Sequence, residues 1–95
     1  MPVQNLQDKI LSVLEKEFKP LAMEVTDDSA RHQGHAGARE SGGSHFRLFL
    51  VSEHFKGMSL VQKHRAVYSA LAGLMHAGIH ALQMEVLTPD EWRQP

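Results

Sequence analysis

The 95-residue chain contains no cysteine. It therefore forms no disulfide bond and offers no thiolate of its own to a metal ion. No apolar run approaches the roughly 18 residues that a transmembrane helix needs. The N-terminal stretch MPVQNLQDKI also lacks the basic and apolar regions of a signal peptide. We therefore expect a cytoplasmic protein without a membrane partner.

An excess of charge of one sign is also missing. The formal net charge is −1, from 10 basic and 11 acidic side chains, so the overall basic character of many nucleic-acid-binding proteins is absent. A local basic patch is not excluded. Seven histidines are present, and their protonation would move the net charge to +6. The chain thus lies close to a change of sign near neutral pH.

Hydrophobic periodicity predicts six elements along the chain. Spacings of three and four residues indicate helices, whereas strict alternation indicates strands. Ser59 with Gln62, and Thr88 with Glu91, are expected to form capping boxes at two helix starts. The predicted order is helix, strand, strand, helix, strand, helix, at residues 5–18, 21–26, 44–52, 60–75, 80–87 and from 88 onward.

This order predicts a single α/β (α+β) domain over residues 1–95. The first two strands can pair antiparallel, whereas the second and third, which a helix joins, should be parallel. A three-stranded mixed sheet with packed helices follows. Along the second helix we expect an apolar stripe that includes His64 as a buried, hydrogen-bonded imidazole, and we expect Trp92 to anchor the last helix.

The segment 27–43 has no bulky apolar residue and is long for a loop in so small a domain. It carries His32 and His35 among several glycines, and His45 lies two positions beyond its end. One interpretation is a flexible arm that presents imidazoles to a ligand. The alternative is a solvated loop, in which histidine and glycine are common.

Four segments of the chain form a pattern that is informative when they are taken together: EVTDDSARH (24–32), SHFRLFLVSEHFKGMSLVQKHRAVYSAL (44–71), IHAL (79–82) and TPDEW (88–92). These segments resemble the BolA family over essentially the whole chain. The resemblance implies a fold similar to class II KH domains and a non-enzymatic adaptor. It also implies a monothiol glutaredoxin as partner, with a 2Fe–2S cluster shared between the two proteins and glutathione, so that a monomer becomes a heterodimer. Some members of the family act as DNA-binding transcription regulators.

The same resemblance assigns candidate metal ligands. The family's invariant histidine corresponds to His80, and its variable-loop ligand corresponds to His32 or, in an extended loop, to His35. Imidazole can replace two thiolates on one iron of a 2Fe–2S cluster. A chain without cysteine must then rely on its partner for sulfur. Alternatively, His80 is a histidine at the rim of the core, or these histidines bind zinc or copper without a partner.

A second candidate site lies in FKGMSLVQKHR, residues 55–65. Lys56, Lys63 and Arg65 place positive charge around the turn at Gly57 and a helix start, where phosphate can bind. The KH clamp GXXG is incomplete, since only the first glycine is present. This surface is a nucleic-acid-binding candidate, a meeting surface for glutaredoxin or a solvated helix face. No catalytic set is predicted, because Asp27, Asp28 and Ser29 lack a nucleophile elbow.

Overall fold

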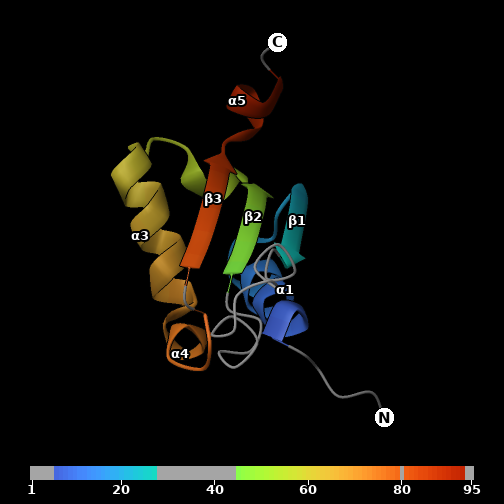
Figure 1. Cartoon of the computed structure of the whole chain (residues 1–95). Coiled ribbons are helices and arrows are strands. Elements are labelled where there is room, and N and C mark those ends of the chain that lie inside the picture. The colour runs from blue at the N-terminus through green and yellow to red at the C-terminus, as the bar shows by residue number, and fades with distance from the viewer. Residues whose placement is uncertain (1–5, 28–44, 80, 94–95) are drawn as a thin grey trace.

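The computed structural model describes residues 6–27, 45–79 and 81–93. The predicted 27–43 loop lies outside this range except for Asp27, which ends a strand. Figure 1 shows the sheet at the centre, with α3 beside β3 and α5 beyond the end of β3. The elements are α1 (Leu6–Phe18), β1 (Ala22–Asp27), β2 (His45–Val51), the 3-10 helix η2 (Glu53–Phe55), α3 (Leu60–Ala70), α4 (Ala72–Met75), β3 (Ala81–Leu87) and α5 (Pro89–Arg93).

The predicted sheet topology is confirmed. The strand order is β1-β2-β3, with β1 antiparallel and β3 parallel to the central β2. The helix-containing connection explains the parallel pair, because parallel strands need a long crossover. Among the described helices, none is both long and apolar enough to cross a membrane.

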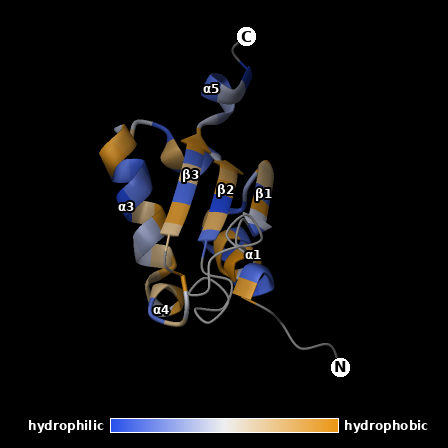
Figure 2. Cartoon of the chain, viewed as in Figure 1, coloured by the Kyte–Doolittle hydropathy of each residue, from blue (hydrophilic) through white to orange (hydrophobic). Residues whose placement is uncertain are grey.

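Both long helices pack on one face of the sheet. Along β2, Phe46, Leu48 and Leu50 are buried, whereas Arg47 between them is exposed. Hydrophobic and hydrophilic colours alternate accordingly along β2 and β3 in Figure 2. Period-two alternation thus separates a core face from an open face. The core cluster unites both helices with this face: Ile10, Leu14, Phe18, Val25, Phe46, Leu48, Leu50, Phe55, Val67, Leu71, Ile79 and Val86.

The end of α1 is fixed by a residue far away in the sequence. Lys19 has a positive φ of 45°, and Pro20 follows, so the helix stops at Phe18 as predicted. The buried Ser52 hydroxyl donates a hydrogen bond of 2.6 Å to the Phe18 carbonyl oxygen. Because the last carbonyls of a helix have no partner inside it, this bond satisfies one of them.

Two expectations for the second helix are wrong. The predicted helix 60–75 is interrupted at Leu71, which ends α3 and begins α4 with φ −95° and ψ 9°. The expected stripe is also incomplete, because Leu60 is 64% exposed while Lys63 is buried. The first turn of α3 extends beyond the hydrophobic core, so apolar spacing there does not produce burial. The capping box of Ser59 with Gln62 is confirmed.

His64 and Trp92 differ from expectation as well. His64 is half-buried, and its buried Nε2 has no hydrogen-bond partner within the part of the chain that the structure describes. Trp92 is 46% exposed, so its indole is not the anchor of α5. Instead, the buried Pro89 and the contacts of Glu91 hold this helix.

Candidate functional site

Three strand ends meet on one side of the sheet. Asp27, the last residue of β1, pairs with Phe46, and His45, the first residue of β2, pairs with Ala81 at the start of β3. Neighbouring strands lie about 4.8 Å apart. The end of β1 and the starts of β2 and β3 therefore lie within roughly two strand spacings of one another.

This arrangement bears directly on the predicted ligands. His32, His35 and His80 lie outside the described residues, but the residues that anchor them do not. The chain enters the segment with His32 and His35 at Asp27 and leaves it at His45. His80 directly precedes Ala81 in the chain. The sheet register thus brings the attachment points of all three histidines to one end of the sheet.

The donor chemistry at this sheet end fits a metal centre completed from outside. The chain segments that adjoin this sheet end carry the candidate imidazoles, and no thiolate is among them, since the chain has no cysteine. His45, which is half-buried, makes at least one contact of its own. Within residues 6–27, 45–79 and 81–93, no group of three or more His, Asp or Glu side chains could hold a metal ion. The candidate ligands remain His80 with His32 or His35, and a sulfur-rich cluster would require thiolates from another molecule.

The 55–65 surface retains only part of its predicted positive charge. Lys56 and Arg65 are exposed, and Lys56 lies 3.8 Å from Glu53 in an ion pair that solvent screens. Gly57 has φ 80°, in the region that favours glycine, so it allows the tight turn that precedes α3. The surface therefore has one exposed cation at the turn, Lys56, and one on α3, Arg65.

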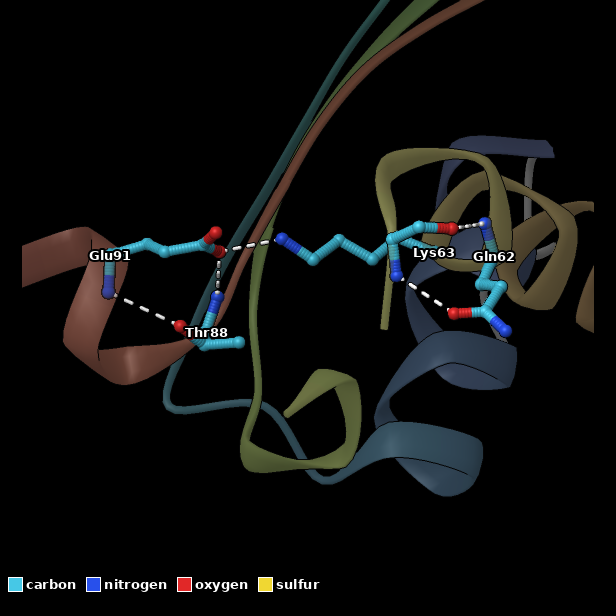
Figure 3. Close-up of polar contacts among 5 residues, drawn as sticks. Gln62, Lys63, Thr88 and Glu91 are labelled. Carbon is cyan, nitrogen blue, oxygen red and sulfur yellow. Dashed lines mark hydrogen bonds and ion pairs between the residues drawn. The ribbon is translucent and has the colours of Figure 1, made fainter. Parts of the chain in front are cut away.

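Lys63 does not belong to this exposed set, which corrects the sequence-based assignment. Its side chain is 6% exposed, and its Nζ lies 2.6 Å from Oε1 of Glu91 (Figure 3). The same carboxylate accepts a hydrogen bond of 2.8 Å from the Thr88 backbone N–H, while the Glu91 N–H donates to the Thr88 hydroxyl over 3.2 Å. Lys63 therefore ties α3 to the predicted capping box of α5, and its ammonium group is not available to phosphate.

The sequence signal for this role of Lys63 is weak. Lys63 and Glu91 are 28 positions apart in the chain. Only the capping box of Thr88 with Glu91 is visible as a local pattern. The tertiary docking of α5 near the first turn of α3 turns that cap into the partner of a buried cation.

Replacement of Glu91 with glutamine should make the stability of the domain depend less on pH in the acid range. The hydrogen bond from Lys63, and then that from the Thr88 N–H, lower the pKa of Glu91 from its ordinary 4.5. The Glu91 carboxylate therefore binds a proton less well in the folded state than in the unfolded state. Its contribution to the free energy of unfolding is complete above the unfolded-state pKa and is lost as pH falls through the folded-state pKa. Melting temperatures across this range should differ between wild type and E91Q near neutral pH and converge in acid. E17Q, on the exposed side of α1, serves as the control.

Several known proteins are similar to this chain in sequence, and solved structures are similar to it in fold. SufE-like protein 1 of Arabidopsis thaliana is 44% identical over 87% of this chain, and the match covers 24% of the length of that relative. Protein BOLA1 of the same plant is 37% identical over 94% of this chain, and the match covers 57% of the length of that relative. The DNA-binding transcriptional regulator BolA of Escherichia coli is 37% identical over 92% of the chain and 79% of its own length.

Solved structures agree with these relatives. The structure of BolA1 from Arabidopsis thaliana has a TM-score of 0.85 at 35% identity, over 99% of this chain and 100% of that one. The BolA domain of SufE1 from the same plant has a TM-score of 0.81 at 39% identity, over 95% and 99%. The family model described as BolA-like protein matches residues 14–91. The chain therefore belongs to the BolA-like family.

Proposed function

We propose that this chain is a non-enzymatic adaptor that binds a monothiol glutaredoxin and shares a 2Fe–2S cluster with it. In this proposal, His80 and one of His32 or His35 supply imidazole nitrogens. The glutaredoxin cysteine and glutathione supply the thiolates that this chain lacks. The role is the transfer of iron–sulfur clusters or the regulation of iron.

The observation that carries the proposal is the register at one end of the sheet. The pairs Asp27–Phe46 and His45–Ala81 bring the attachment points of the histidine-bearing segments together. Because both ends of the 28–44 segment are fixed there, a ligand from this segment and His80 can approach the same metal without any rearrangement of the sheet. Membership of the BolA-like family supports the same reading.

Imidazole ligation suits a cluster that must be passed on or sensed. When bound, a 2Fe–2S cluster with two histidine ligands has a higher reduction potential than one with four thiolates. Histidine must be neutral to bind metal, so protonation competes with ligation in mild acid. His80 and its loop partner would therefore hold the cluster conditionally, in a complex that neither protein forms alone.

Reconstitution of the two proteins tests the proposal. The chain is mixed with a monothiol glutaredoxin, glutathione, iron and sulfide without oxygen, and the complex is isolated by size exclusion. We expect a one-to-one heterodimer whose visible absorption and circular dichroism differ from those of glutaredoxin with its own cluster. A mixture that yields only the glutaredoxin spectrum, and no heterodimer, would contradict the proposal.

A second candidate function is nucleic-acid binding through residues 55–65. The Escherichia coli relative is named a DNA-binding transcriptional regulator, and this candidate rests on that similarity. On this chain, Lys56 is exposed at the turn of Gly57, and Arg65 is exposed on α3. This surface lies beyond the C-terminal end of β2, whereas the histidine anchors lie at its start, so both functions can coexist.

Replacement of Arg65 with alanine should weaken DNA binding in a salt-dependent way. The loss of one phosphate contact should lower the affinity roughly three- to tenfold at low salt and reduce the slope of log K against log salt by about 1. Fluorescence anisotropy with a labelled duplex measures both quantities. K9A, which removes an exposed charge from α1, should change neither. Equal effects of R65A and K9A would rule out this surface as the binding site.

A further inference from the structure

The face of the sheet opposite the two long helices carries an aromatic ring between two carboxylates. Glu24 pairs in register with Phe49, and Phe49 pairs with Glu85. These three residues, here called the Glu24–Phe49–Glu85 row, cross the sheet from β1 to β3. Both glutamates are exposed and Phe49 is half-buried. The Cα atoms of the glutamates are thus about 10 Å apart, with the ring between them.

The row lies in a hollow of the surface. The hollow has a volume of about 410 Å³, and its lining residues are Glu24, Thr26, Arg47, Leu48, Phe49, Gln83, Met84 and Glu85. All three strands therefore contribute to it. Phe49 stands on the central strand, so its backbone is already ordered when a ligand arrives.

The charges of the row are not neutralised by other described side chains. Among the residues that the structure describes, Glu24 and Glu85 form no ion pair. Arg47, in the next row of the open face, lines the same hollow and makes a contact of its own. The carboxylates therefore remain able to accept hydrogen bonds from a cation above the ring.

We propose that the Glu24–Phe49–Glu85 row is a docking site for an arginine side chain of a protein partner. A cation above an aromatic face is attracted by the negative charge of the ring, and arginine takes this position more often than lysine. The planar guanidinium stacks on the ring and presents N–H groups at its edges, where carboxylates can accept them. The row supplies both kinds of contact at the spacing of three neighbouring strands.

Charge complementarity decides between the kinds of partner. Two carboxylates repel phosphate, so nucleic acid does not suit this row. A purely apolar partner segment would bury the carboxylates without partners, which costs free energy. An arginine side chain can stack on the ring and donate hydrogen bonds to both carboxylates. The site is independent of the proposed cluster, because Phe49 lies four residues, or roughly 13 Å, along β2 from His45.

The test uses a capped tripeptide with a central arginine and a matched peptide with citrulline, which has the same shape without the charge. The full chain, labelled with ¹⁵N, is titrated with each peptide at low salt, and amide chemical shifts are followed. We expect the arginine peptide to shift the amides around Glu24, Phe49 and Glu85, with weak affinity typical of one exposed contact. Citrulline should bind at least about threefold less tightly.

Variants separate this site from general attraction of a cation. E24Q and E85Q should each weaken arginine binding about two- to fivefold, whereas E17Q on α1 should leave it unchanged. F49L keeps an apolar side chain but removes the ring, and it should weaken binding by a similar factor. Equal binding of the arginine and citrulline peptides, or equal effects of E24Q and E17Q, would overturn the proposal. Unchanged amide spectra away from the row would show that each variant is folded.

Discussion

Replacement of His80 with alanine should weaken the cluster-bound heterodimer strongly while the chain remains folded. Mutation of a residue that only hydrogen-bonds a metal ligand already reduces metal affinity about 10- to 100-fold. Removal of a ligand itself should reduce the affinity at least as much. We therefore expect the H80A complex to release its cluster at least roughly tenfold faster than wild type, with an altered visible spectrum. Absorption over time after reconstitution with glutaredoxin and glutathione measures both.

His54 provides the matched control for this prediction. It is an exposed histidine that follows the C-terminal end of β2, whereas His80 precedes the start of β3 at the opposite end of the sheet. H54A should therefore leave the cluster spectrum and lifetime unchanged. H32A and H35A decide which loop histidine is the second ligand, because only the true ligand should reproduce the effect of H80A. An H80A complex identical to wild type would refute the ligand assignment.

Replacement of Phe55 with alanine should remove a large part of the stability of the domain. Phe55 is the first residue of the 55–65 surface, yet its side chain is fully buried in the core, with its ring 4.9 Å from that of Phe18. Burial of a phenylalanine of this kind contributes about 3–5 kcal/mol to the free energy of unfolding. A domain of this size has only about 5–15 kcal/mol in total. Urea denaturation should show a much lower midpoint for F55A.

Leu60 gives the comparison within the same surface. Because 64% of Leu60 is exposed, L60A should change the free energy of unfolding by less than about 0.5 kcal/mol. The contrast would show that Phe55 anchors the turn at Gly57 in the hydrophobic core, whereas Leu60 remains accessible to a partner. If L60A destabilised the protein as much as F55A, the described packing of this turn would be wrong.

Local patterns in the sequence were sufficient for the element order and the sheet. The alternation in 44–52 predicted the strand β2, and the capping boxes at Ser59 and Thr88 marked two helix starts that the structure confirms. Chain connectivity then gave one antiparallel and one parallel strand pair. Helix starts and strands depend on residues within a few positions of one another, and the parallel pair depends on the helix that connects its strands. Both kinds of information can be read from a single sequence.

The tertiary structure alone decided which side chains are available. The sequence gives Lys63 and Arg65 the same cationic character, but the docking of α5 buries Lys63 against Glu91, 28 positions away, and leaves Arg65 exposed. The Glu24–Phe49–Glu85 row likewise exists only because the register of three strands aligns residues 25 and 36 positions apart. Periodicity tells which face a residue occupies, whereas its partners across that face depend on how distant segments pack together.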